Sequence, residues 1–111
     1  MNGEQNYPYA GPETLRRPVL AALHHVVDPE VAMTIVDVGL VYGVTVTPER
    51  LHVLLTMTSA ACPVADVILD DTFTELEAVA PPGMDVDVEL VWEPPWTTDR
   101  MSAGAKAFMG W

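Results

Sequence analysis

The first regular pattern of apolar residues in the chain has the spacing of a helix. From Thr14 onward, large apolar side chains recur every three or four positions, which places them on one face of a helix. They are Leu15, Val19, Leu23 and Val26. Proline drives the residue before it out of the helical region, so Asp28-Pro29 ends the pattern. The spacing therefore predicts a helix over about Thr14 to Val27.

Two alternating patterns follow and predict a hairpin. Apolar residues occupy every second position in residues 40–47 and again in residues 51–58, as in strands with one buried face. They are Leu40, Tyr42, Val44 and Val46 in the first segment, and Leu51, Val53, Leu55 and Met57 in the second. Pro48-Glu49-Arg50 lies between them and has the composition of a turn. Two antiparallel strands are expected.

The second half of the chain predicts another helix and a third strand. A broad apolar face runs from Pro63 to about Val79 and stops at Pro81-Pro82-Gly83. From Met84 to Trp92, apolar residues alternate mainly with acidic ones, which indicates one buried face and one wet face. The order α-β-β-α-β, with a short C-terminal helix, predicts an α+β fold of two layers. We expect a small three-stranded mixed sheet with both long helices on one face.

The two ends of the chain are expected to lie outside this sheet. Residues 1–13 are polar and rich in proline and glycine, which predicts a flexible tail. Residues 14–111 then form a single domain, whose C-terminal tail, 93–111, begins with prolines that do not continue a strand. Several large apolar side chains in the C-terminal tail favour docking on the parent domain over an exposed partner surface. They are Trp96, Met101, Phe108, Met109 and Trp111.

Charge and composition limit the classes of binding partner that the chain is expected to have. The formal net charge of −11 would repel phosphate backbones and anionic lipids, so nucleic acid and membrane surfaces are not expected as partners. The apolar runs are too short to span a bilayer, and the N-terminus lacks the layout of a secretion signal, so we expect a cytoplasmic protein. A single cysteine excludes a disulfide within one chain.

That cysteine, Cys62, is the first candidate for chemistry. It precedes Pro63, and proline is favoured at the first position of a helix, so Cys62 is expected to be the N-cap. Unpaired N–H groups and the helix dipole stabilise a thiolate there, the form that binds metal or attacks an electrophile. Asp66 in the first helical turn opposes this effect. The alternative is that Cys62 is a small buried apolar side chain.

Four sequence blocks, in this order, resemble those of the metal-sulfur cluster assembly factors. This family includes accessory proteins of the SUF system, eukaryotic cytosolic iron-sulfur targeting factors and accessory proteins of phenylacetate ring oxygenation. The blocks are Asp28-Pro29-Glu30, Ile35–Tyr42, Thr56–Pro63, and Trp92–Trp96 with Met101-Ser102. The chain departs from the family at Ala60 and in residues 31–34, and it lacks the cysteine-rich extension of the phenylacetate group.

The resemblance implies a fold of the iron-sulfur cluster assembly type and a role in maturing metalloproteins. It also implies a functional centre at Cys62 and Asp37, with Glu30 and Thr58 as neighbours. For both acidic residues the alternative is a structural role, in which the carboxylate caps backbone N–H groups of the loop.

The chemistry of these residues fits the transient holding or transfer of iron or an iron-sulfur cluster. A cluster normally takes four thiolates, whereas one chain supplies one, so a homodimer, small thiols or a client metalloprotein would have to complete the ligand set. Carboxylates suit iron(II) better than a sulfide-rich cluster, so direct delivery of iron is also open.

Three other functions remain as alternatives at this stage. The first is an assembly chaperone or iron donor for one specific di-iron oxygenase. The second is an enzyme with Cys62 as nucleophile, although the predicted elements place no histidine near the thiol. The third is a pure interaction module that uses the aromatic tail and the acidic surface. For the maturation role, the expected partners are a client metalloprotein or other assembly factors. We expect a maturation factor rather than an enzyme.

Overall fold

The structure is a computed structural model that describes residues 7–29, 31–58 and 65–110. The strands in these ranges are β1 (Tyr9–Ala10), β2 (Val27–Asp28), β3 (Met33–Thr34), β4 (Val41–Val46), β5 (Arg50–Leu55) and β6 (Asp85–Leu90). The helices are α1 (Glu13–His24), α2 (Ile35–Val38), α3 (Ala65–Val79), the 3-10 turn η1 (Thr98–Arg100) and α4 (Ala103–Met109). Within the described ranges, no helix is both long enough and apolar enough to cross a membrane.

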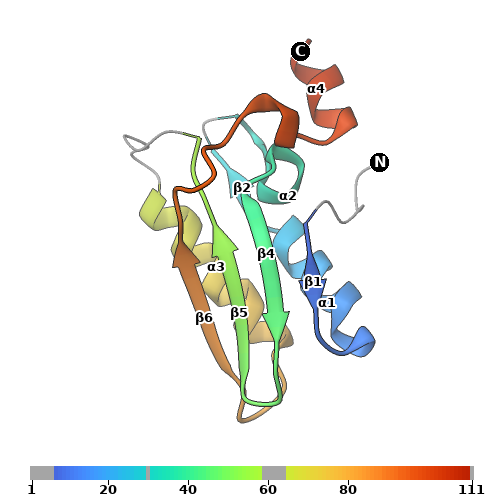
Figure 1. Ribbon diagram of the computed structural model, residues 1–111, viewed down its shortest axis with the longest axis vertical. Coiled ribbons are helices and arrows are strands. Elements are labelled where there is room, and N and C mark those ends of the chain that lie inside the picture. The colour runs from blue at the N-terminus through green and yellow to red at the C-terminus, as the bar shows by residue number, and fades with distance from the viewer. Residues whose placement is uncertain (1–6, 30, 59–64, 111) are drawn as a thin grey trace.

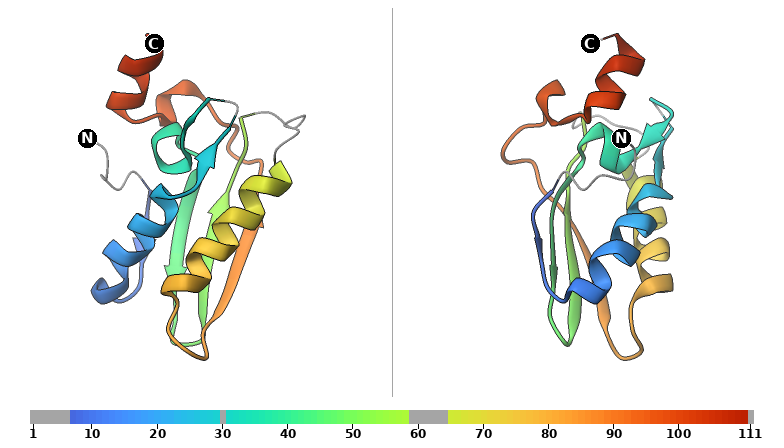
Figure 2. Two further views of the ribbon diagram at one scale, coloured as in Figure 1. Left: turned by 180° about the vertical axis from the view of Figure 1, so that it is seen from behind. Right: turned by 90° about the vertical axis from the view of Figure 1, so that its right-hand side faces the viewer.

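The main sheet confirms the predicted α+β class. Strands β4 and β5 form the antiparallel hairpin, and β6 returns parallel to β5 after the crossover through α3. Helices α1 and α3 lie side by side against one face of the sheet, as the right-hand view of Figure 2 shows. The alternation predicted for β5 is confirmed, because Leu51, Val53, Leu55 and Met57 are all buried.

The predicted strand count was wrong. In the described residues, the main sheet has four strands in the order β1-β4-β5-β6, and β1 pairs in parallel with β4 through Tyr9 and Ala10. This edge strand lies in the segment assigned to the N-terminal tail. It escaped prediction because two residues are too short to show an alternating pattern. Tyr7, just before it, is buried in the core.

A second difference lies between α1 and β4, in a segment whose sequence showed no regular pattern. Here β2 and β3 pair as a short antiparallel hairpin, and α2 follows directly. The predicted first helix extended to Val27, but α1 ends at His24 and Val27 belongs to β2. The β-branched Val26 and Val27 favour extended backbone over a further helical turn.

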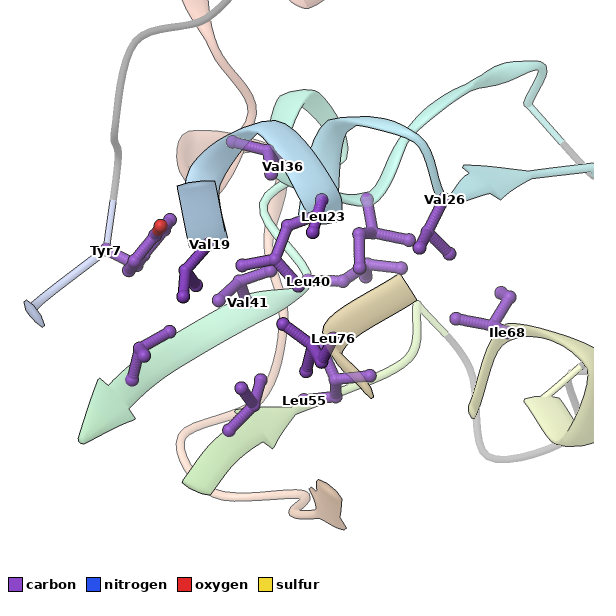
Figure 3. Close-up of a cluster of buried hydrophobic side chains, with 14 of the residues drawn as sticks. Tyr7, Val19, Leu23, Val26, Val36, Leu40, Val41, Leu55, Ile68 and Leu76 are labelled. Atoms are coloured by element: carbon purple, nitrogen blue, oxygen red, sulfur yellow. The ribbon is translucent and has the colours of Figure 1, made fainter. Parts of the chain in front are cut away.

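The core fills the space between the sheet and the two long helices. Figure 3 shows side chains from α1, β4, β5 and α3, among them Leu23, Leu55 and Leu76, converging on one cluster. The register of β4 shifts between Val41 and Gly43, so Val41 is buried although its place in the alternation predicted a wet position. An inserted residue of this kind reverses which side chains face the core.

Candidate functional site

The predicted site residues divide into two groups. Cys62 and Glu30 lie outside the described residues, whereas Asp37 and Thr58 lie inside them. Asp37 is on α2, just before β4, and Thr58 follows β5. The N–H of Thr56 donates to the carbonyl of Leu40 at 2.8 Å, which brings the exit of β5 beside the entry to β4. Asp37 and Thr58 therefore lie at the same end of the sheet, where Figure 1 also places α2 and α4.

Local sequence explains why Asp37 sits on a helix of four residues. Thr34 is the N-cap of α2, and its Oγ1 accepts a hydrogen bond from the N–H of Asp37 at 3.1 Å. Threonine is favoured there because its side chain pairs an N–H that the helix leaves unpaired. At the other end, Gly39 adopts the left-handed conformation, with φ of 85°, that commonly closes a helix. With both ends fixed, the short helix places Asp37 at a defined position.

The carboxylate of Asp37 accepts hydrogen bonds from two hydroxyl groups, which come from different parts of the chain. Ser102, after β6, donates through its Oγ to Asp37 Oδ1 at 3.0 Å, and Thr34 Oγ1 lies 3.2 Å from Asp37 Oδ2. The alternative raised from sequence was capping of loop N–H groups. In the described part of the chain, the partners of this carboxylate are side-chain hydroxyls instead.

Residues 96–102 of the C-terminal tail dock on the domain at this end of the sheet, as the sequence favoured. Of the other large apolar residues in the tail, Phe108 is 75% exposed and Trp111 lies outside the described residues. The backbone N–H of Ser102 donates to the carbonyl of Asp37 at 2.8 Å, and the indole N–H of Trp96 donates to the carbonyl of Val38 at 2.9 Å. Met101 is buried between these contacts, with 5% of its surface exposed. The tail is thus hydrogen-bonded to the backbone carbonyls of two successive residues of α2, Asp37 and Val38.

A histidine that the sequence did not single out also belongs to this group. His24, at the end of α1, places its Nδ1 3.2 Å from Thr34 Oγ1. Its Nε2 is buried and has no hydrogen-bond partner among the described residues. The sequence did not indicate this contact with Thr34, because it depends on the β2–β3 hairpin, which brings Thr34 back to α1. The expectation that no histidine lies near the thiol concerns Cys62, which is outside the described residues. His25 and His52 contact Glu75 and Glu89 on the surface, away from Asp37.

Comparison with known proteins identifies the protein family to which this chain belongs. The model described as iron-sulfur cluster assembly protein matches residues 16–90. The chain belongs to this family. The resemblance drawn from sequence blocks is confirmed.

The chain is similar to two curated relatives and to one solved structure. It is 43% identical to the Fe-S protein maturation auxiliary factor YitW of Bacillus subtilis, over 88% of this chain and 96% of that protein. It is also 43% identical to the Fe-S protein maturation auxiliary factor SufT of Staphylococcus aureus, over 77% of this chain and 97% of that protein. A domain of unknown function from Bacillus anthracis is 38% identical, with a TM-score of 0.81, and the match covers 88% of this chain and 93% of that chain.

Asp28, in the first block of the family resemblance, is a candidate that the predicted site set omitted. It is 1% exposed, and it is the only buried acidic residue in the described ranges. Burying a carboxylate is costly unless it is paired, so a buried aspartate is held by specific contacts. Asp28 lies in β2, which pairs with β3, the strand that ends at Thr34, so it belongs to the segment that leads to Asp37. The signal in the sequence was the block Asp28-Pro29-Glu30 itself, of which only Glu30 was chosen.

The described residues alone do not form a complete metal site. Among them, no three histidine, cysteine, aspartate or glutamate side chains are arranged to hold a metal ion. Asp37 fits the role of one oxygen ligand, since a carboxylate has about four acceptor positions and the two hydroxyls use two of them. Thr58 is exposed at the same end of the sheet. Any further ligands for iron must come from the remaining residues of the chain, small thiols or another protein.

Proposed function

We propose that this protein is an auxiliary factor in the maturation of iron-sulfur proteins, which holds iron or a cluster transiently through Cys62 and Asp37 and passes it on. Membership of the iron-sulfur cluster assembly family and the names of its relatives support the general role. The observation that carries the specific proposal is the carboxylate of Asp37, which two hydroxyls fix in place at the end of the sheet from which the chain enters residues 59–64.

The chemistry of the two proposed ligands explains a transient role. A thiolate and a carboxylate can bind iron(II), but two ligands from one chain leave coordination positions open. Small thiols, a second copy of the chain or the client protein can take these positions. An incomplete ligand set holds iron weakly enough for a client with a full set of cysteines to remove it. The net charge of −11 also favours the approach of cations.

Anaerobic loading with iron(II), alone and with sulfide, tests the proposal. The wild-type chain is compared with Cys62→Ser and Asp37→Asn, and iron per chain and the visible spectrum are measured. Asp85→Asn is the matched control, because it removes the same charge from an exposed residue at the far end of β6. We expect Cys62→Ser to lose the sulfur-to-iron absorption and Asp37→Asn to bind iron(II) about tenfold more weakly, while Asp85→Asn matches the wild type.

A transfer assay completes this test. Loaded wild-type protein is mixed with an apo-ferredoxin, and cluster appearance in the acceptor is followed by its spectrum. We expect faster activation than with free iron and sulfide at equal concentrations. Equal loading and transfer by the wild type and Cys62→Ser would remove Cys62 from the mechanism.

A further inference from the structure

We infer that Ser102 is a positioning residue for Asp37, so that the C-terminal tail completes the functional centre from outside the sheet. The inference rests on the proposed function, because it concerns the same carboxylate. It goes beyond the family match, which ends at residue 90, and beyond the site residues that the sequence indicated. It begins from the two hydrogen bonds that join Ser102 to Asp37, one from the side chain and one from the backbone.

Counting hydrogens fixes the direction of the side-chain bond. Ser102 is the N-cap of α4, and its Oγ accepts from the N–H of Ala105 at 3.1 Å. A serine hydroxyl has one hydrogen and two acceptor positions. An ionised carboxylate only accepts, so the single hydrogen of Ser102 is directed to Asp37 Oδ1. One hydroxyl therefore starts α4 and orients the carboxylate at the same time.

The rest of the tail holds Ser102 at this place. The indole of Trp96 is hydrogen-bonded to the carbonyl of Val38, and Met101 is buried next to Ser102. Arg100 stacks over the ring of Tyr42, with its Cζ 4.1 Å from the ring centroid. The phenol of Tyr42 donates in turn to the carbonyl of Pro94 at 2.6 Å. Side chains from β4 and α2 thus tie both ends of the segment 94–102 to the domain.

This arrangement restricts the rotation of the Asp37 side chain. Thr34 contacts one carboxylate oxygen and Ser102 the other, so the remaining acceptor positions keep one orientation. Partners of this kind in metal sites typically change metal affinity by 10-fold to 100-fold when they are removed. Loss of the Ser102 hydroxyl alone is expected to weaken iron(II) binding about tenfold.

The test compares substitutions at Ser102 in the full chain by anaerobic titration with iron(II). Ser102→Gly removes the hydroxyl and costs α4 little as an N-cap, whereas Ser102→Thr keeps both functions of the hydroxyl. We expect about tenfold weaker binding for Ser102→Gly and rescue by Ser102→Thr. Ser102→Ala is also measured, because it removes the hydroxyl without the extra backbone freedom that glycine introduces. Tryptophan emission checks that the tail stays docked in each variant.

A double-variant cycle separates positioning from general stability. If Ser102 acts through Asp37, Ser102→Gly causes no further loss of binding in an Asp37→Ala chain. Wild-type affinity in both Ser102→Gly and Ser102→Ala, or losses that multiply in the double variant, would overturn the inference while leaving the proposed function intact. If Asp37→Ala itself binds iron(II) like the wild type, the role of Asp37 fails, and the inference fails with it.

Discussion

Gly39 lies against the main chain of Arg100, so closely that a side chain at position 39 would overlap the carbonyl oxygen of Arg100. Its φ of 85° is also one that residues with a side chain rarely adopt. Gly39 closes α2 two residues after Asp37, and Arg100 lies two residues before Ser102. The close approach at this glycine therefore allows the tail to reach the candidate site.

Replacement of Gly39 by alanine is predicted to destabilise the protein and release the tail. Gly83→Ala is the matched control, because Gly83 has nearly the same φ, 83°, but a Cβ added there would meet no atom within 4 Å. Both variants carry left-handed strain of about 1 kcal/mol, and Gly39→Ala loses a further ~2 kcal/mol through the overlap with Arg100. Urea unfolding measures the difference. Equal losses in the two variants would show that the contact with Arg100 contributes nothing.

A second prediction concerns the indole of Trp96. Trp96→Phe keeps an aromatic ring but leaves the carbonyl of Val38 without its 2.9 Å hydrogen bond, which costs about 1 to 2 kcal/mol of unfolding free energy. Trp92→Phe is the control, since it makes the same change of side chain at a tryptophan that is 43% exposed. Thermal unfolding followed by circular dichroism compares them. An equal midpoint for Trp96→Phe and the wild type would contradict the prediction.

The fold could be predicted where one pattern extended over a whole element. Strand β5 alternates without interruption, and its parallel neighbour β6 was recognised from acidic residues on one face. Prediction failed where an element depends on which strand it pairs with. Strand β1 has two residues, and only its pairing with Val44 and Thr45 of β4 makes it a strand. The bulge near Gly43 likewise depends on how β4 fits β5.

The candidate site could be predicted only in part, for a similar reason. Asp37 was found through a block of neighbouring residues, which a sequence displays directly. Ser102 also lies in a block of the resemblance, but its contact with Asp37, like the contact of His24 with Thr34, joins separate segments, and no pattern in the sequence shows such a contact. Docking of the tail was predicted from its large apolar residues. The sequence did not indicate that a serine in that tail would contact the carboxylate.

The buried phenol of Tyr7 predicts a loss of stability at alkaline pH. Burial, assisted by nearby Tyr9, raises the pKa of Tyr7 to about 12 in the folded protein. The pKa of an unfolded tyrosine is about 10. Between these values the unfolded chain binds fewer protons than the folded one, so the contribution is complete below about pH 10 and declines as the pH rises toward 12.

The variant Tyr7→Phe isolates this effect, because phenylalanine fills the same space and does not titrate. Urea midpoints of the two proteins are measured at a series of pH values. We expect the wild type to lose stability relative to Tyr7→Phe from about pH 10 upward. A constant difference between the two proteins across this range would show that the phenol of Tyr7 ionises equally in both states.

The last prediction follows from the hydrogens shared by Thr34, Asp37 and His24. The hydroxyl of Thr34 has one hydrogen, and its oxygen already accepts from the N–H of Asp37. If that hydrogen is directed to the carboxylate of Asp37, the 3.2 Å contact with His24 is a hydrogen bond only when Nδ1 of His24 is the donor. His24 is therefore predicted to be the Nδ1–H tautomer when neutral, with Nε2 unprotonated.

Long-range proton–nitrogen correlation spectra at about pH 9 distinguish the two tautomers, and the chain contains its own comparison. His52 contacts Glu89 through Nε2 at 3.0 Å, so His52 is predicted to be the opposite, Nε2–H tautomer. Thr34→Val removes the acceptor and should release His24 from its preference without altering His52. An Nε2–H tautomer for His24 in the wild type would direct the hydrogen of Thr34 to the imidazole instead. The carboxylate of Asp37 would then be oriented by Ser102 alone.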